Sequence, residues 1–247
     1  MALRVDGSTA LVTGASSGIG AAISEELAAA GCKVLLSGRD PDRLAEVARR
    51  TGGRVCPADL ADPAGSEQLV AAAGEVDVLV HSAGAGWAGQ FTDMPEDRVL
   101  ELTAVNLTAP MLLTRAALPG MVQRRRGHIV FVSSIAAVGV RGEEVYSATK
   151  AGLRAFATSL RYRAEPHGVG VSTVFPGAVR TPFFDRRGTP YDRRFPRMIA
   201  PEAVARQAVR AIERGIDEVY VPRWLELAVR VQGLFPGAFH RLARRFG

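Results

Sequence analysis

The feature that most constrains the fold is a glycine-rich turn near the start of the chain, between a strand pattern and a helix pattern. Residues 9–13 form a short apolar run with β-branched residues, and residues 19–30 follow a helical pattern. The turn between them reads Thr13-Gly-Ala-Ser-Ser-Gly-Ile-Gly20. Its three glycines allow a tight turn, a close approach of backbone amides to a pyrophosphate and close packing of the helix on the strand. This unit predicts a dinucleotide-binding α/β domain.

Strand and helix patterns alternate along the rest of the chain. We expect strands at residues 33–37, 54–56, 76–81, 128–133 and 170–175, and helices between them, including residues 41–50 and 202–214. Such alternation implies right-handed crossovers and a parallel sheet covered on both faces. The 247 residues fit one large domain, so we predict a doubly wound sheet of the Rossmann type. The domain is expected at residues 1–222, with residues 223–247 as an amphipathic extension of it.

A tyrosine and a lysine four residues apart, Tyr146 and Lys150, face the same side of a predicted helix. A positive charge beside a phenol favours the phenolate and lowers its pKa from the usual value near ~10. The pair can therefore act as an acid and base near neutral pH. Ser134 and Asn106 precede it in the chain, and strand alternation points Ser133 away from the face that Ser134 occupies.

Taken together, these motifs resemble the single-domain branch of the short-chain dehydrogenase/reductase family over residues 6–222. The matching segments are the glycine-rich turn, Asp59-Leu60, His81-Ser82-Ala83-Gly84, Asn106, Ser134, Tyr146 with Lys150, and Pro176-Gly177 leading to Thr181. The family usually has two asparagines where this chain has His81 and Ser82. We therefore expect different hydrogen bonding at the end of that strand.

The resemblance implies an oxidoreductase that interconverts a ketone and a secondary alcohol by hydride transfer. Tyr146 would donate or accept the proton, and Lys150 would lower the pKa of Tyr146 and hold the nicotinamide ribose. Ser134 would donate a hydrogen bond to the substrate oxygen, and Asn106 would position a water on the proton path. The implied cofactor-binding residues are Gly14, Ser16, Ser17, Gly18, Ile19, Gly20, Arg39, Asp59, Leu60, Ser82, Ala83, Gly84, Tyr146, Lys150, Pro176, Gly177, Val179 and Thr181.

The end of the second predicted strand indicates which nicotinamide cofactor binds. Relatives that prefer NAD place an acidic residue there, whereas this chain has Gly38 followed by Arg39. Arg39 can pair with a 2′-phosphate and stack on adenine. Asp40 is one position too late for the acidic role and is expected to cap the helix that begins at Pro41. We predict NADP(H).

Residues 182–201 contain four prolines and a run of arginines, which argue against a regular element. We interpret them as a lid over a bound ligand. The mixture of aromatic and basic residues suits a hydrophobic ketone or alcohol, and it also suits a 3-oxoacyl thioester on coenzyme A or carrier protein. A solvated basic loop anchored in the core is a third interpretation. A non-catalytic dinucleotide sensor is the alternative from another functional class.

The tail after Trp224 has two short amphipathic patterns, separated by Pro236-Gly237. Apolar residues recur at Leu227, Ala228, Val231, Leu234, Phe235, Phe239, Leu242 and Phe246, with Arg230, Arg241, Arg244 and Arg245 among the polar positions. The tail would dock on the chain's own cleft or on a neighbouring subunit; contact with an anionic membrane is the alternative. By resemblance, residues 104–123 and 145–166 would pair in a homodimer or homotetramer.

Basic residues outnumber acidic ones by 31 to 25, giving a formal net charge of +6. The excess is divided among separate segments, so we expect no nucleic acid partner. The four histidines are scattered and suggest no metal site. Cys32 and Cys56 lack C-x-x-C spacing, which indicates reduced thiols. There is no apolar leader, and no apolar run reaches the ~18 residues of a membrane span, so a soluble cytoplasmic protein is expected.

Overall fold

Parallel strands form one central sheet in the computed structural model, which describes residues 1–192, 196–237 and 241. In these ranges the sheet has the order β3-β2-β1-β4-β5-β6-β7. The strands are β1 (Thr9–Thr13), β2 (Lys33–Ser37), β3 (Arg54–Val55), β4 (Val78–His81), β5 (Gly127–Val132), β6 (Val169–Pro176) and β7 (Glu218–Val221). This order reverses between β1 and β4, and in doubly wound sheets ligands bind in the crevice at that point. The Rossmann-type prediction is confirmed.

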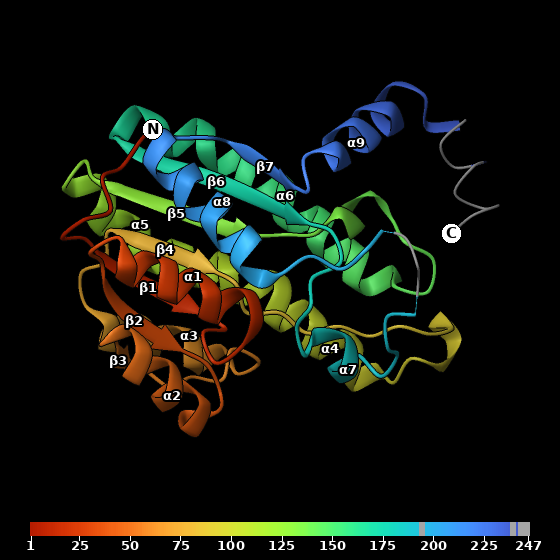
Figure 1. Ribbon diagram of the computed structural model, residues 1–247, viewed down its shortest axis with the longest axis horizontal. Coiled ribbons are helices and arrows are strands. Elements are labelled where there is room, and N and C mark those ends of the chain that lie inside the picture. The colour runs from red at the N-terminus through yellow and green to blue at the C-terminus, as the bar shows by residue number, and fades with distance from the viewer. Residues whose placement is uncertain (193–195, 238–240, 242–247) are drawn as a thin grey trace.

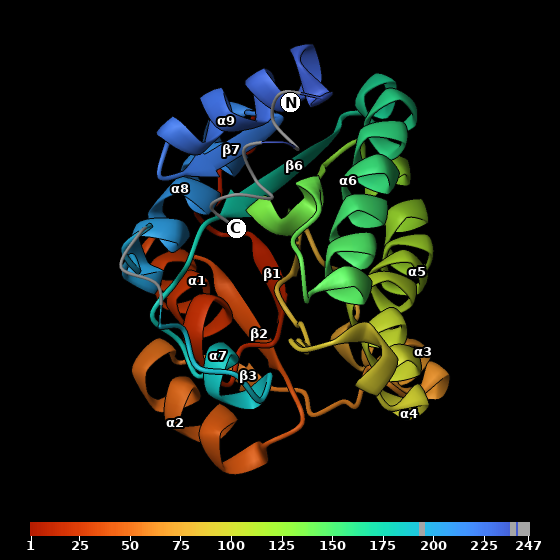
Figure 2. The same ribbon diagram turned by 90° about the vertical axis from the view of Figure 1, so that its right-hand side faces the viewer.

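Helices cover both faces of the sheet (Figure 1, Figure 2). The helices are α1 (Gly18–Ala29), α2 (Pro41–Thr51), α3 (Pro63–Ala73), α4 (Glu96–Thr103), α5 (Ala109–Gln123), α6 (Glu144–Ala164), α7 (Phe183–Arg186), α8 (Pro201–Arg214) and α9 (Trp224–Leu234). Helices α1, α2 and α8 bury their apolar residues on one face, and α3, α5 and α6 bury theirs on the other. None of the helices in the described ranges is long and apolar enough to cross a membrane.

The strands are apolar on both sides because both faces of the sheet are covered. In β1, Ala10 and Val12 pack into the layer that contains α1 and α8, whereas Leu11 packs into the layer that contains α5 and α6. All three side chains are fully buried. Successive side chains in a strand point to opposite faces, so a continuous apolar run supplies both layers at once.

The start of α2 follows the predicted capping pattern. The Asp40 carboxylate accepts a hydrogen bond of 3.1 Å from the backbone N–H of Arg43, and Pro41 begins the helix. Both features are typical of helix starts, since the proline has no N–H that would need a partner there. The expected role of Asp40 as a helix cap is confirmed. The Asp40 side chain therefore caps α2. It lies one position after Arg39, which is the residue expected to contact the 2′-phosphate of the cofactor.

Two elements differ from the sequence-based prediction. Strand β7, Glu218–Val221, was not predicted from the sequence. The expectation that residues 182–201 hold no regular element was wrong, since α7 forms one helical turn there. Pro182 lies at the N-cap of α7, where a proline costs no hydrogen bond.

We predict that Gly20→Ala destabilises the fold by about 1–3 kcal/mol, the usual cost of overpacking a tight site. A Cβ at Gly20 would overlap sterically with the Gly14 carbonyl oxygen, which belongs to the backbone and cannot rotate away. The matched control is Gly233→Ala in α9, where a Cβ meets nothing within 4 Å. The control should leave stability unchanged or raise it slightly, because alanine favours helix. Urea denaturation measures both, and equal midpoints for the two variants would contradict the prediction.

Candidate active site

The glycine-rich turn lies against two other segments at the carboxyl ends of the strands. Gly14 has a φ of +67°, and a Cβ on it would lie 2.7 Å from the Cα of Ala83, at the end of β4. Gly18 has a φ of +58°, and a Cβ there would lie 2.9 Å from Cγ2 of Thr181, at the base of the lid. Side chains at these two positions would clash and strain the backbone. The two glycines therefore allow the glycine-rich turn, the end of β4 and the base of the lid to pack closely against one another.

The Thr13 hydroxyl joins the ends of β1 and β4. Its Oγ1 donates to the Val80 carbonyl at 3.2 Å, and accepts from the backbone N–H groups of Ser82 at 3.1 Å and Ala83 at 3.2 Å. These bonds satisfy backbone donors at the point where the family usually has two asparagines. Although His81 and Ser82 replace those two asparagines, the end of β4 is still hydrogen-bonded to Thr13 at the start of the glycine-rich turn.

His81 points away from the turn into the layer of α5. Its Nε2 lies 2.9 Å from Oγ1 of Thr114, and its ring stacks on Phe131 at a centroid distance of 4.8 Å. Burial lowers the pKa of His81 to about 3, so the imidazole is neutral at physiological pH. The histidine is therefore a packing and hydrogen-bonding residue of the core.

A cavity of about 590 Å³ opens at the carboxyl ends of the strands. Most of the residues that the sequence predicts for the site line it, namely Gly14, Ser16, Ser17, Gly18, Ile19, Gly20, Arg39, Ser82, Gly84, Ser134, Tyr146, Lys150, Pro176, Gly177, Val179 and Thr181. Asp59, Leu60 and Ala83 do not line it. Asp59 accepts a hydrogen bond from the backbone of Ala61, Leu60 is buried in the core, and Ala83 packs behind Gly14.

Ser134 and Tyr146 are connected by a side-chain hydrogen bond. Tyr146 projects from the first turn of α6, and Ser134 caps the short 3-10 helix Ile135–Val138, accepting from the Ala136 N–H at 3.1 Å. The neighbouring Ser133 instead donates to the Lys150 carbonyl at 3.0 Å. The two serines therefore serve different partners, in agreement with the expected alternation, and Ser134 is the one whose hydroxyl faces Tyr146.

Lys150 lies one turn below Tyr146 and is buried. Its Nζ donates to the Val132 carbonyl at 3.0 Å and lies 5.7 Å from the centre of the Tyr146 ring. Burial lowers the pKa of Lys150 to about 8. An amine with a pKa close to neutral can both hold and release a proton under physiological conditions.

The expected lowering of the Tyr146 pKa by Lys150 is not what the structure shows. Burial raises the pKa of the Tyr146 phenol, the hydrogen bond with Ser134 lowers it, Glu143 raises it and Arg187 lowers it, and burial prevails. The Lys150 ammonium is directed at the Val132 carbonyl and is itself desolvated, which limits its effect on the phenol. In this structure Tyr146 is therefore a protonated phenol at neutral pH.

Asn106 lies behind the cavity rather than in its wall. It belongs to a π-helical turn, Ala104–Thr108, between α4 and α5. Its side chain accepts from the Ala85 N–H at 2.8 Å and donates to the Ala85 carbonyl at 2.9 Å and to the Thr149 hydroxyl at 3.2 Å. Such π-turns are frequent at functional sites. Asn106 thus fixes the segment after β4 against α6.

The lid reaches Tyr146 through two contacts that the sequence did not predict. The Phe183 ring lies 5.3 Å from the Tyr146 ring, and Arg187 forms an ion pair with Glu143, three residues before the tyrosine. The Arg187 guanidinium also lies 4.7 Å from the centre of the Phe184 ring, and only 9% of this arginine is exposed. The separation of 44 positions between Glu143 and Arg187 explains why no local pattern could indicate the pair.

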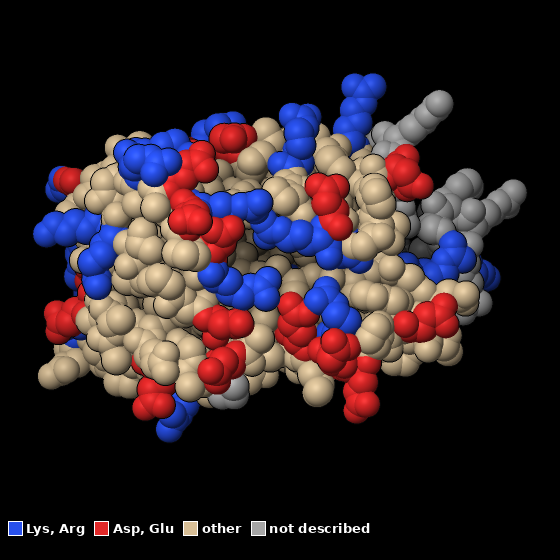
Figure 3. Space-filling view, turned by 90° about the horizontal axis from the view of Figure 1, so that it is seen from below, with Lys and Arg blue, Asp and Glu red and all other residues tan. Residues whose placement is uncertain are grey.

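Charged residues surround the opposite end of the cavity, where Arg39 lies. Its guanidinium pairs with Glu101 of α4 at 3.7 Å, and Glu101 also pairs with Arg98. All three line the cavity, and the sequence did not single out Arg98 or Glu101. Viewed from below, the molecule is hollowed, and Lys and Arg side chains follow the hollow with Asp and Glu beside them (Figure 3).

The first turn of α9 closes the remaining side of the cavity. Trp224 and Leu225 line it, and Leu225 packs with Phe175 and Tyr220. The helix ends at Leu234, two residues before the expected break. Of the second amphipathic pattern, Phe239, Leu242, Arg244, Arg245 and Phe246 lie outside the described residues.

Comparison with known proteins places this geometry in a family. The family model described as short chain dehydrogenase matches residues 8–191. "Dehydrogenase/reductase SDR family member 7B" of Mus musculus is 32% identical over 257 residues, which cover 94% of this chain and 79% of that protein. The structure of a short-chain dehydrogenase from Sphingobium yanoikuyae in complex with NADPH matches with a TM-score of 0.82 at 30% identity, covering 93% of this chain and 95% of that one.

A short chain dehydrogenase/reductase from Burkholderia phymatum in complex with NAD has the same fold, with a TM-score of 0.84 at 23% identity over 94% of both chains. At that identity the likeness concerns the fold alone. The family match and the mouse relative extend over most of the chain, and the residues matched by the family model include the glycine-rich turn, Tyr146 and Lys150. The chain belongs to the short-chain dehydrogenase/reductase family, whose members are oxidoreductases that use a nicotinamide dinucleotide.

Proposed function

We propose that this protein is an NADP(H)-dependent oxidoreductase that interconverts a hydrophobic ketone and a secondary alcohol. One observation carries the proposal: Ser134, Tyr146 and Lys150 line the same cavity as the glycine-rich turn. A proton donor and a dinucleotide cradle in one cavity allow proton and hydride transfer to a single carbonyl. A dinucleotide sensor without catalytic activity would need no such proton relay.

The residues present fit a dinucleotide. The absence of a Cβ at Gly14 and Gly18 lets the turn pack against Ala83 and Thr181, and the start of α1 would direct backbone N–H groups toward a pyrophosphate. Lys150 would hold the nicotinamide ribose from the floor of the cavity. When bound, the cofactor supplies hydride for reduction and accepts it in oxidation.

The proton chemistry follows from burial. Tyr146 carries its proton at neutral pH, which suits donation to the carbonyl oxygen during reduction. Ser134 shares a hydrogen bond with Tyr146 and would stabilise the charge that develops on the same oxygen. Lys150, with a pKa of about 8, would return a proton toward the phenol along a path that Asn106 helps to hold in place.

The preference for the phosphorylated cofactor rests on the end of β2. Gly38 and Arg39 stand where a carboxylate would repel a 2′-phosphate, and Arg39 lines the cavity. The guanidinium can form charge-assisted hydrogen bonds with a phosphate. The ion pair of Arg39 with Glu101 is long and the Arg39 side chain is mostly exposed, so a phosphate dianion would compete well for the guanidinium.

The substrate end of the cavity favours an apolar carbonyl compound. Val140, Phe183, Phe184 and Trp224 contribute to its walls. Arg187, the cation nearest to Tyr146 in the lid, is already paired with Glu143 and therefore offers little to a free carboxylate. These apolar walls would bury a bulky apolar group beside the reacting carbonyl and make dispersion contacts with it.

We also propose that the protein forms a homodimer or homotetramer through α5 and α6. Leu112 of α5 and Tyr162 of α6 are exposed apolar side chains, and Tyr162 is 73% exposed. Large apolar side chains exposed on neighbouring helices are typical of surfaces that another subunit covers.

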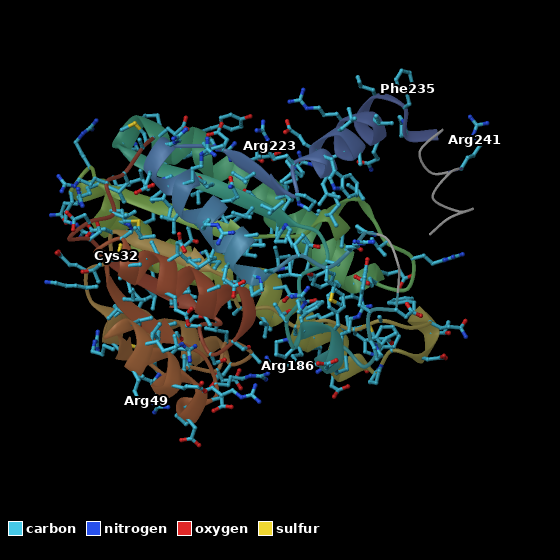
Figure 4. The ribbon with its side chains drawn as sticks, viewed as in Figure 1. Cys32, Arg49, Arg186, Arg223, Phe235 and Arg241 are labelled. Carbon is cyan, nitrogen blue, oxygen red and sulfur yellow. The ribbon has the colours of Figure 1, made fainter. Side chains whose placement is uncertain are left out.

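The tail supports a further proposal, contact with an anionic membrane surface through α9. Its first turn is docked on the cavity, but Leu227, Leu234 and Phe235 are exposed on the remainder. Figure 4 shows Phe235 and Arg241 at the end of the molecule, away from the sheet. Apolar side chains next to arginines are the composition of helices that lie in a membrane interface.

Tyr146→Phe should lower the rate of NADPH-dependent ketone reduction by at least about a thousandfold, in the range expected for a lost general acid. NADPH binding, measured by nucleotide fluorescence, should change little, because the ring still packs on Phe183. The matched control is Tyr162→Phe in the same helix, an exposed tyrosine that should retain full activity. The assay is NADPH consumption over acyl thioesters, diketones, quinones and bulky cyclic ketones. Retained turnover in Tyr146→Phe would refute the proposed mechanism.

The pH dependence of alcohol oxidation should move in opposite directions in two variants. Glu143 raises the pKa of Tyr146 and Arg187 lowers it, and oxidation requires the deprotonated phenol. Glu143→Gln should therefore shift the rising limb of the pH–rate profile to lower pH, and Arg187→Gln should shift it to higher pH. The exposed neighbour Glu144→Gln serves as control and should leave the limb in place. A shift in the same direction for both variants would contradict the prediction, because the position of the lid rather than the charge of these residues would then set the pH of the rising limb.

The double variant Leu234→Asp/Phe235→Asp should reduce co-flotation with vesicles rich in phosphatidylserine by about tenfold or more, because two exposed apolar anchors become charged. The control Phe91→Asp/Leu100→Asp changes two exposed apolar residues far from α9 and should float like the original chain. Equal flotation of both double variants would exclude attachment through α9.

A further inference from the structure

Two arginines from separate segments line the cavity, and the charge of a third, Arg43, acts on one of them, Arg186. Arg39 follows β2, Arg43 lies in the first turn of α2, and Arg186 is the last residue of α7 in the lid. Arg39 and Arg186 both line the cavity. Figure 4 shows Arg186 extending from the lid toward the side of the molecule formed by α2.

Arg186 makes a direct link between the lid and the cofactor turn. Its Nη2 donates a hydrogen bond of 3.3 Å to the hydroxyl of Ser17, although 169 positions separate the two residues. Ser17 immediately precedes α1, whose N-terminal N–H groups attract anions. The guanidinium therefore already lies beside the predicted phosphate-binding part of the cavity.

The electrostatics of this cluster favour an anion. Burial lowers the pKa of Arg186, and so do the charges of Arg43 and Arg39. Arg43 is paired with Asp40 at 3.3 Å and Arg39 with Glu101 at 3.7 Å, while Arg186 donates to an uncharged hydroxyl. Like charges held together are unfavourable unless a negative group lies between them. A phosphate dianion would relieve this repulsion.

We propose that Arg186 of the lid completes a three-arginine site, with Arg39 and Arg43, for the 2′-phosphate of NADP(H). The proposal rests on the proposed cofactor preference and deepens it, because it assigns part of that preference to the lid. A phosphate has three terminal oxygens and can accept charge-assisted hydrogen bonds from several guanidinium groups at once. Arg186 is thus a specificity-determining residue that acts on the cofactor.

The same contact would connect the cofactor to the substrate pocket. Arg186 lies in the single turn of α7 with Phe183, whose ring packs on Tyr146, and it directly precedes Arg187, which pairs with Glu143. A phosphate that holds Arg186 on the glycine-rich turn also holds Phe183 and Arg187 in place. The phosphorylated cofactor therefore stabilises the closed lid, whereas the form without the 2′-phosphate does not.

The test compares Arg186→Gln with Arg197→Gln, an arginine of the same lid that is exposed and does not line the cavity. Dissociation constants for NADPH and NADH are measured by fluorescence titration. Arg186→Gln should raise the dissociation constant for NADPH about tenfold, which is the effect of one charge-assisted hydrogen bond at a partly exposed site. The dissociation constant for NADH should stay unchanged. Arg197→Gln should change neither.

Limited digestion with chymotrypsin reports on the lid, because its cleavage sites at Phe183, Phe184 and Tyr191 are the same in every variant. NADPH should slow cleavage of the lid in the unmodified protein more than saturating NADH does. In Arg186→Gln this difference should disappear, and in Arg197→Gln it should remain.

The results separate the inference from the function on which it rests. Equal affinity of the unmodified protein for NADPH and NADH would overturn the cofactor preference, and the three-arginine site with it. A preference for NADPH that persists in Arg186→Gln, with NADPH still protecting the lid, would overturn only the role of the lid. An equal rise in the dissociation constants for NADPH and NADH in that variant would also overturn the role of the lid, because Arg186 would then contact a part of the molecule that both cofactors share.

Discussion

The close approach of the glycine-rich turn to the end of β4 is the constraint on which the rest of the site depends. Gly14 can lie against Ala83 only without a side chain, and the Thr13 hydroxyl then ties both strand ends together. This contact lies at the point where the strand order reverses, so the crevice of the parallel sheet opens there. The cavity, the base of the lid at Thr181 and the start of α1 all take their positions from it.

Burial, rather than pairing of opposite charges, sets the protonation of the candidate proton relay. Desolvation raises the pKa of Tyr146 and lowers that of Lys150 to about 8, so the phenol keeps its proton while the amine can exchange one near neutral pH. The Ser134 hydrogen bond and Arg187 lower the pKa of the Tyr146 phenol, whereas Glu143 raises it. Because Arg187 comes from the lid, the acidity of Tyr146 depends on where the lid lies.

The lid contacts both ends of the cavity through adjacent residues. Arg187 holds the start of α6 through Glu143, and Arg186 reaches the glycine-rich turn through Ser17. Helix α7, which ends at Arg186, is a single turn and is too short to be stable without tertiary contacts. Ligands at either end therefore have the means to stabilise the closed position of this segment.

Local patterns were sufficient for the alternating strands and helices, the cap at Asp40 and the pairing of Tyr146 with Lys150 on one helix face, because apolar periodicity, turn chemistry and helical spacing are properties of neighbouring residues. The place of Ser134 beside them came from the resemblance to the family. The strand β7 and the single turn α7 were missed; tertiary contacts hold both in place, since β7 pairs with β6 and Phe183 of α7 packs on Tyr146. Only the tertiary structure decided that Glu143 pairs with Arg187, that Glu101 pairs with Arg39, and that burial raises the pKa of the Tyr146 phenol. Those outcomes depend on distances between residues far apart in the chain and on the exclusion of water, neither of which a linear pattern contains.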